Sequence, residues 1–148
     1  MLYHVPDIAR ALREARRVLR PGGVALLVAN GVADKREVRE LWHEAASAVD
    51  ASFTQPGETR RFNVDTADEL VGAVFDDLRV DWLTGEFRIP TPEPVLAWAD
   101  SLRDGTEAEV DADTWAAVSA ELRARIERRI AADGAFVVTK SSGVIVAR

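Results

Sequence analysis

The sequence predicts an α/β fold, in which helices and strands alternate along one domain-sized chain. The 148 residues are 47% hydrophobic and 30% charged, as expected of a globular domain large enough to bury a core. Apolar residues recur at helical spacing in segments such as 8–19 and 115–130. Short apolar runs of strand length, such as 24–29, lie between them. This alternation is typical of an α/β layer fold.

The first helix and the first strand are the most clearly marked elements. Pro6-Asp7 is expected to start the helix, with Asp7 as its cap, and Pro21-Gly22-Gly23 to stop it. Its apolar stripe is Ile8, Leu12, Ala15 and Leu19. The unbroken apolar run 24–29 then predicts a strand that is covered on both faces, as in a parallel sheet.

Two further helices are predicted from capping boxes. Asp34 and Glu37 have the spacing of a capping box, and a stripe that includes Trp42 follows them. Residues 52–65 are interpreted as a loop, in which Arg60-Arg61 form a solvated pair or meet an acidic substrate. Thr66 and Glu69 form the second expected capping box, before a helix whose inner face is Leu70, Val71, Val74 and Phe75.

The second half alternates in the same way. Leu78, Val80 and Trp82 predict a strand that runs past a bulge at Gly85 to residue 89. Residues 90–92 break it and cap a short helix that carries Val95, Leu96, Trp98 and Leu102. An acidic linker (104–113) precedes a long helix that ends at Gly134. Residues 135–139 and 144–147 predict a final strand or hairpin.

Composition excludes several classes of function. The net charge of −6 gives no basic surface for nucleic acid or anionic lipid. The chain has no cysteine and two histidines, which argues against disulfides, thiolate catalysis and a zinc site. No apolar run reaches the length of a bilayer span and no signal peptide is recognisable, so we expect a cytoplasmic protein.

Two motifs near the start carry a resemblance to a known family. Leu-Tyr-His-Val-Pro-Asp (2–7) and Arg-Val-Leu-Arg-Pro-Gly-Gly (17–23), followed by the apolar run 24–29, resemble the second half of a class I S-adenosylmethionine-dependent methyltransferase of the type 11 group. The resemblance implies the C-terminal part of a Rossmann-like sheet of order 3-2-1-4-5-7-6, with strand 7 antiparallel. Residues 24–29 would be strand 5, the strand from Leu78 would be strand 6, and the closing residues strand 7.

The same resemblance implies candidate site residues. Tyr3 and His4 would lie at the end of strand 4, facing S-adenosylmethionine and the methyl acceptor. His4 is a candidate for shaping the acceptor pocket or for taking the acceptor's proton; the alternative is local packing with a hydrogen bond to a backbone carbonyl. Asn30 and Gly31 end strand 5 on the same rim and are candidates for substrate binding. Trp42 is a weaker candidate, because its place on the apolar stripe favours the core.

The family's cofactor-binding elements are missing from the sequence. Members hold the cofactor with a glycine-rich turn after strand 1 and an acid that ends strand 2, and neither pattern occurs here. We therefore expect one truncated methyltransferase-like domain (1–148) whose N-terminal cofactor-binding half is absent. An acceptor lid (32–65) and a helical insertion (90–133) would interrupt it.

Such a chain would be inactive on its own, although its family transfers a methyl group to a small-molecule acceptor. The alternative is a non-catalytic half-domain, or a binding module, that acts through a partner chain. Strand 5 would be left with an open edge, which predicts self-association or pairing with the missing N-terminal half.

Overall fold

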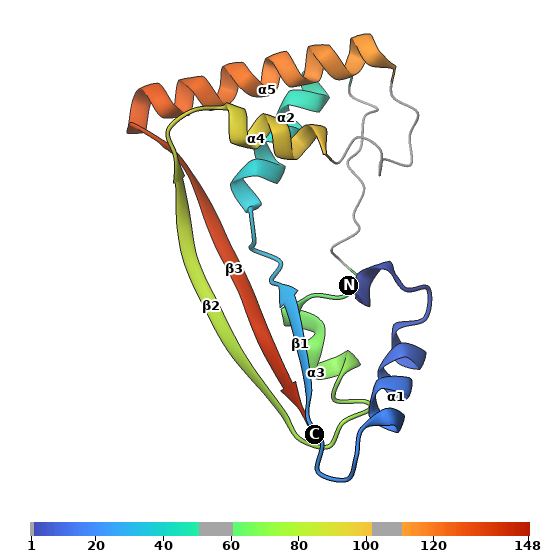
Figure 1. Ribbon diagram of the computed structural model, residues 1–148. Coiled ribbons are helices and arrows are strands. Elements are labelled where there is room, and N and C mark those ends of the chain that lie inside the picture. Colours follow the sequence, from blue (N-terminus) through green and yellow to red (C-terminus); the bar gives the residue numbers. More distant parts are fainter. Residues whose placement is uncertain (1, 51–60, 102–110) are drawn as a thin grey trace. The chain divides into compact units, whose positions relative to one another are not determined.

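The computed structural model describes residues 2–50, 61–101 and 111–148 (Figure 1). It is a mixed α/β structure with one antiparallel sheet of three strands. Along the chain the elements are the short 3-10 helix η1 (Leu2–His4), α1 (Ile8–Val18), β1 (Ala25–Asn30), α2 (Arg36–Val49), the 3-10 helix η3 (Val64–Thr66), α3 (Ala67–Leu70), β2 (Leu78–Ile89), α4 (Glu93–Asp100), α5 (Ala112–Asp133) and β3 (Phe136–Ala147). None of these helices is both long and apolar enough to cross a membrane.

The chain divides into two compact units. The first unit comprises Met1–Asp34, Gly57–Gly85 and Lys140–Arg148, and the second comprises Lys35–Pro56 and Glu86–Thr139. The segments 32–65 and 90–133, which were expected as insertions, supply much of the second unit. Strands β2 and β3 each contribute residues to both units.

The sheet has the order β1-β3-β2, so β3 is central and β1 lies at an edge. β1 is antiparallel to β3, with Ala25 opposite Ala147 and Asn30 opposite Ser142. Burial alternates along β1, and Leu26 and Val28 are 66% and 69% exposed. The prediction of a strand covered on both faces is therefore wrong, because within the described residues only one face of β1 is covered.

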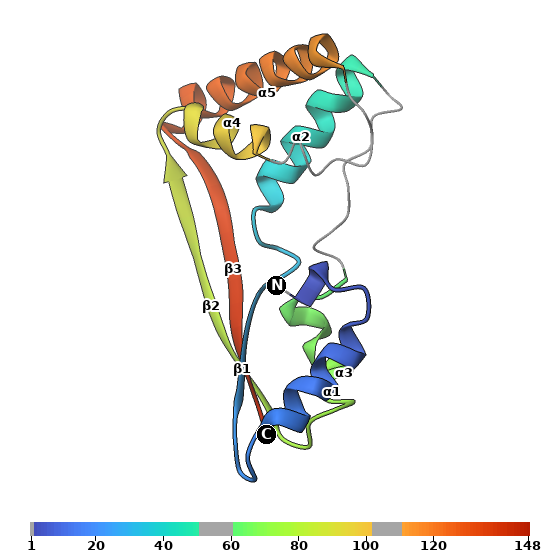
Figure 2. The same cartoon turned by 45° about the vertical axis from the view of Figure 1, so that its right-hand side comes forward.

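The covered face of the first unit packs on α1 and α3, which lie on the same side of β1 in both Figure 1 and Figure 2. Leu12 of α1 is buried there at 1% exposure, as its place in the predicted stripe requires. The buried core of this unit is Leu12, Phe62, Ala67, Val71, Phe75, Ile145 and Ala147. The predicted inner positions Val71 and Phe75 are thus confirmed.

The ends of α1 follow the sequence signals. Asp7 caps the helix and accepts a hydrogen bond from the backbone N–H of Arg10 at 2.8 Å. The chain then turns through Gly22, whose φ of +75° is a conformation that glycine adopts without strain. This turn directs residue 25 into β1.

The second unit is a helical core that is closed by the start of β3. Trp42 of α2 packs against Trp115 of α5, with ring centroids 5.0 Å apart. Val95 of α4 and Phe136 of β3 are buried in the same cluster. The indole N–H of Trp115 donates to Asp100 at 2.9 Å, which ties α4 to α5.

The predicted capping box at Asp34 and Glu37 is wrong. Helix α2 begins after Lys35, which has a φ of +53° and gives no side-chain cap. Asp34 accepts hydrogen bonds from Lys140 and Ser141, and Glu37 accepts from Thr139. Donors more than 100 positions away in the sequence bind the two carboxylates that the local pattern assigned to the helix cap.

Other boundaries also differ from the prediction. The second capping box is formed by Asn63 and Thr66 at η3, not by Thr66 and Glu69, and α3 is a single turn. β3 is one continuous strand and not a hairpin, while β2 spans the predicted range to Ile89. Arg60, Leu102 and most of the expected linker (104–113) lie outside the described residues.

Candidate functional site

Polar side chains gather where β1 ends, in the first unit. Lys140 donates to Asn30 Oδ1 and to Asp34 Oδ1, both at 2.9 Å. The Asp34 side chain is 4% exposed and also accepts from the backbone N–H of Ser141 at 3.0 Å. A buried carboxylate needs such partners, because burying it alone costs several kcal/mol. We call Asn30, Gly31, Asp34, Lys140 and Ser141 the β1 rim.

The other side of the β1 rim is closely packed around Gly31. A Cβ on Gly31 would lie 2.7 Å from Ser141 Oγ and 2.9 Å from the Trp82 ring, so only glycine fits. Asp65 Oδ2 accepts from the backbone N–H of Val32 at 2.7 Å, directly after the rim. The backbone at the end of β1 is therefore held by side chains from three other segments.

Tyr3 and His4, the candidates for binding the cofactor and the methyl acceptor, lie in η1, before α1. The rings of Tyr3 and His4 contact each other with centroids 4.2 Å apart. His4 is exposed, and among the described residues its ring contact is with Tyr3 and it makes no hydrogen bond. Its role in acceptor binding stays a prediction.

Asn30 and Gly31 lie in the β1 rim, as the sequence predicted for the end of this strand. Trp42, the third substrate-binding candidate, lies in the core of the second unit and is 3% exposed. Its indole is occupied by packing against Trp115 and offers almost no surface to a substrate. The structure thus keeps Asn30 and Gly31 together and leaves Trp42 in the other unit.

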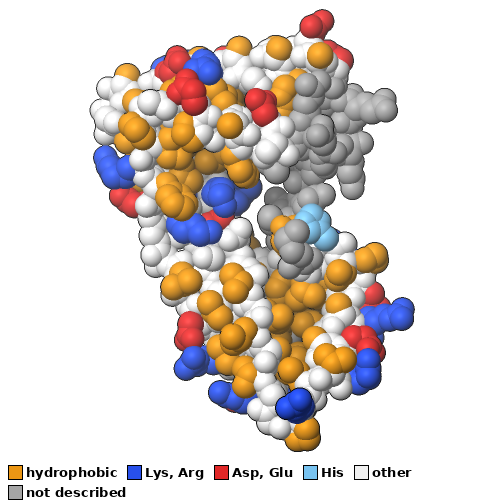
Figure 3. Space-filling model, in the orientation of Figure 1, with side chains coloured by type: hydrophobic (Ala, Val, Ile, Leu, Met, Phe, Trp, Pro, Cys, Tyr) orange, Lys and Arg blue, Asp and Glu red, His pale blue; other side chains and the backbone are white. Residues whose placement is uncertain are grey.

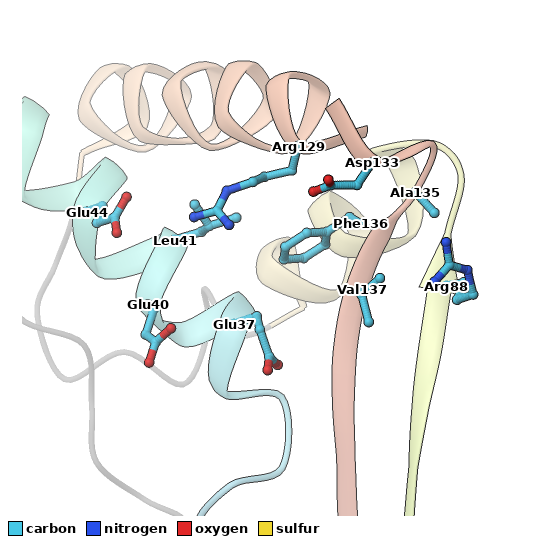
Figure 4. Close-up of a pocket in the computed structure, with 10 residues that line it drawn as sticks. All are labelled: Glu37, Glu40, Leu41, Glu44, Arg88, Arg129, Asp133, Ala135, Phe136 and Val137. Atoms are coloured by element: carbon cyan, nitrogen blue, oxygen red, sulfur yellow. The ribbon is translucent and has the colours of Figure 1, made fainter. Parts of the chain in front are cut away.

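A shallow pocket of about 190 Å³ lies in the second unit (Figure 4). Its floor includes Leu41 and Phe136, and charged side chains of α2 and α5 stand around it. Two of its carboxylates are already engaged: Glu37 accepts from the Thr139 hydroxyl at 2.6 Å, and Glu44 pairs with Arg125 at 2.8 Å. These two carboxylates therefore serve the unit's own structure.

The ionisation of Glu37 reflects these contacts. Partial burial opposes its charge, but hydrogen bonds from the hydroxyl and backbone N–H of Thr139 outweigh burial and lower the pKa of Glu37 below its ordinary 4.5. Glu93 is fully exposed, and its hydrogen bond with Arg123 lowers its pKa to about 2. Both carboxylates act as structural acceptors and not as proton donors near neutral pH.

Sequence reasoning missed four members of this region: Asp34, Lys140, Ser141 and Asp65. Asp34 was assigned to a cap, and the other three were interpreted as strand or loop residues. One signal was available, because Lys140 is a charge inside an otherwise uncharged closing segment (135–147). A lone charge in a central strand needs a partner, although the sequence does not say which.

The described residues do not fit a metal or, by themselves, the family's cofactor. No group of three or more histidine, aspartate or glutamate side chains in the described ranges could hold a metal ion. Gly23, Gly31 and Gly143 are each crowded by protein atoms, and Gly22 lies in a helix-ending turn. None of them forms an open glycine cradle of the kind that binds a dinucleotide or S-adenosylmethionine.

Comparison with known proteins finds a family match at the start of the chain. Residues 1–27, which form η1, α1 and the start of β1, match the family described as Methyltransferase domain. No curated protein matches the chain. The family match covers 27 of the 148 residues and coincides with the two motifs at 2–7 and 17–23.

Proposed function

We propose that this chain is the C-terminal half of a class I, S-adenosylmethionine-dependent methyltransferase domain that acts on a small-molecule acceptor. The observation that carries the proposal is the sheet order. Strands β1, β3 and β2 lie in the order expected of strands 5, 7 and 6, and β3 is antiparallel to β1, as expected of strand 7. The family match at residues 1–27 ends inside the first of these strands and adds independent support.

In this proposal the β1 rim contacts the methyl acceptor. Ligands of open α/β sheets bind at the carboxyl ends of strands, and Asn30 and Gly31 occupy that end of β1. Lys140 holds the amide oxygen of Asn30, which leaves the amide NH2 to donate to an acceptor oxygen. His4 would contact the acceptor or take its proton, with Tyr3 supporting its ring.

S-adenosylmethionine, when bound, supplies the methyl group, and its main contacts must come from elsewhere. A segment with a glycine-rich turn and a ribose-binding acid would provide them, from the same protein or from a partner. The contribution of this chain is then to position the acceptor. Positioning alone can supply much of the acceleration of such a transfer.

The first test is titration calorimetry of S-adenosylmethionine into the 148-residue chain. We expect no measurable heat of binding, because the glycine cradle is missing. Micromolar affinity would contradict this assignment of roles. Sequencing the coding DNA upstream of the Met1 codon is the companion test: an in-frame strand and glycine-rich turn would identify the cofactor-binding half.

The second test uses the chain joined to, or mixed with, that half. Asn30→Ala should raise the KM for the acceptor while the affinity for S-adenosylmethionine is unchanged, because Asn30 is assigned to the acceptor. Arg79→Ala, on exposed β2, is the control. Unchanged kinetics in Asn30→Ala would remove the β1 rim from the acceptor site.

A further inference from the structure

Asp65 and Trp82 lie close together at the carboxyl end of β1, on the side of the β1 rim where Gly31 lies. A Cβ placed on Gly31 would be 2.9 Å from the Trp82 ring and 3.3 Å from Asp65 Oδ2. A carboxylate and an indole ring therefore pack against the same glycine. The proposed function gives neither of them a role.

Asp65 is held in place by its own segment. Asn63 and Thr66 form the capping box of η3 around it, and Val64 is buried at 3% exposure. Asp65 Oδ2 accepts from the backbone N–H of Val32 at 2.7 Å. The residue is exposed, and its other oxygen, Oδ1, accepts no hydrogen bond and pairs with no cation among the described residues. One oxygen of this carboxylate is thus open to a ligand.

Trp82 presents an aromatic surface at the same place. It follows Leu78 and Val80 at alternate positions of β2, so its side chain lies on the sheet face that α1 and α3 cover. Trp82 is nevertheless 47% exposed, one of several large hydrophobic side chains on the surface of the first unit (Figure 3). Because β3 separates β2 from β1, a strand paired with the outer edge of β1 would not lie beside Trp82.

The charge at this end of β1 is negative. The Lys140 ammonium is neutralised by the Asp34 carboxylate at 2.9 Å, on the other side of the β1 rim. Asp65 has no such partner, and within the described ranges no cation lies over the Trp82 ring. An anionic ligand would be repelled here, whereas a cation would be attracted both by the carboxylate and by the face of the indole ring.

We propose that Asp65 and Trp82 bind the ammonium group of a small organic amine. Alkylamines have a pKa near that of lysine, about 10.4, so such a ligand is positively charged near neutral pH. Its carbon atoms can lie on the indole while its N–H groups donate to Asp65 Oδ1. A divalent metal would need further oxygen ligands, and the described residues offer no group of three acidic or histidine side chains to supply them.

The identification of this amine as the methyl acceptor rests on the proposed function. Arg61 donates to the carbonyl of Pro6 at 2.8 Å, which links the segment before η3 to the segment after η1. Asp65 in η3 and the acceptor candidate His4 in η1 therefore belong to neighbouring segments of the first unit. The proposed acceptor is then an amine, and not an acid or a neutral alcohol.

Heteronuclear NMR titration of the 148-residue chain, without S-adenosylmethionine, tests the ammonium site. Three probes of similar size differ in the head group: butylammonium, 1-butanol and butyrate. We expect butylammonium to shift the backbone N–H signals of Gly31 and Val32 and the indole N–H signal of Trp82. 1-Butanol should bind about tenfold more weakly, because it lacks the charge that both protein groups attract. No shift with butylammonium, equal binding of 1-butanol, or a preference for butyrate would overturn the proposal.

Two variants locate the site, with far-UV circular dichroism as the check that they fold. Asp65→Asn removes the charge and keeps an oxygen for the N–H of Val32, and should weaken butylammonium binding about threefold. Trp82→Leu keeps an apolar side chain and should weaken binding by a similar factor, measured on the two backbone signals. Asp81→Asn, which removes an exposed carboxylate of β2 paired with Arg79, is the matched control and should leave the affinity unchanged. Equal losses in Asp65→Asn and Asp81→Asn would show binding by general charge and would overturn the proposal.

The titration separates this inference from the proposed function, because it requires neither the cofactor nor methyl transfer. If butylammonium does not bind, the amine site is removed and the methyltransferase assignment stays with its own tests. If butylammonium binds while those tests fail, the ammonium site stands without a role in methyl transfer.

Discussion

The two units of this chain differ in how completely they bury their apolar side chains. Seven of the exposed large hydrophobic residues among those described belong to the first unit and two to the second. The seven are Val18, Val24, Leu26, Val28, Val32, Trp82 and Leu83, and the two are Val49 and Phe87. The second unit closes a helical core upon itself, whereas the first covers one face of its sheet and leaves the other open.

This difference indicates where the chain meets other molecules. Apolar side chains that are already buried in a close-packed interior gain no further burial when a partner binds. An apolar strand edge with outward hydrogen-bonding groups does gain from one. We therefore expect the first unit to be the part that binds, and this unit also contains the family match and the β1 rim.

The largest effect on stability is expected when a leucine is replaced by alanine in each of the two units. Leu122→Ala removes a fully buried side chain from the second unit and should lower the free energy of unfolding by about 2–5 kcal/mol. Leu26→Ala removes an exposed one from the first unit and should change it by less than about 0.5 kcal/mol in dilute solution. Urea unfolding followed by far-UV circular dichroism measures both. Equal losses would contradict the comparison.

A second prediction concerns the polar cluster of the first unit. Lys140→Met removes the ion pair of the buried Asp34 carboxylate while the hydrogen bond from the backbone N–H of Ser141 stays, and should cost about 1–3 kcal/mol. Arg79→Met breaks an exposed pair with Asp81 and should cost less than about 1 kcal/mol. The same unfolding assay separates them. If both variants unfold at the same urea concentration, the β1 rim is not held by Lys140.

A smaller, pH-dependent effect is expected in the second unit. The folded pKa of Glu37 lies below its ordinary 4.5, so the folded state binds fewer protons than the unfolded state. Its contribution to stability is complete above pH 4.5 and is lost as the pH falls through the lowered pKa. Thermal unfolding of the parent and of Glu37→Gln between pH 6 and pH 3 should show a shallower loss in the variant. Parallel curves would show that Glu37 does not link α2 to β3 through Thr139.

Local sequence patterns predicted most elements, but not the partners of their polar side chains. The cap of α1 by Asp7, the turn at Gly22 and the extent of β2 depend on neighbouring residues, and all three were predictable. Asp34 and Glu37 have the spacing of a capping box, yet their partners come from β3, more than 100 residues away. A capping box is a local pattern, and long-range donors from β3 override it.

Some positions of the candidate site were likewise predictable from the sequence, and others were not. The place of Asn30 and Gly31 at the end of β1 was predictable from the apolar run before them, and their binding role stays a prediction. Lys140 lies at the end of β1 because β3 pairs with β1, and Asp65 is placed there by η3. The spacing of these residues in the sequence predicts neither contact. The one-sided burial of β1 was also unpredictable, since an unbroken apolar run does not reveal which face has a partner.

Within the residues that the structure describes, β1 pairs on one edge only, and amide hydrogen exchange of the dilute chain tests this central claim residue by residue. The N–H groups of Leu27 and Ala29 face β3 and should be protected, whereas those of Leu26 and Val28 face outward and should exchange much faster. Protection of Leu26 and Val28 equal to that of Leu27 and Ala29 in the most dilute sample would show that the edge is already covered, and would contradict the account.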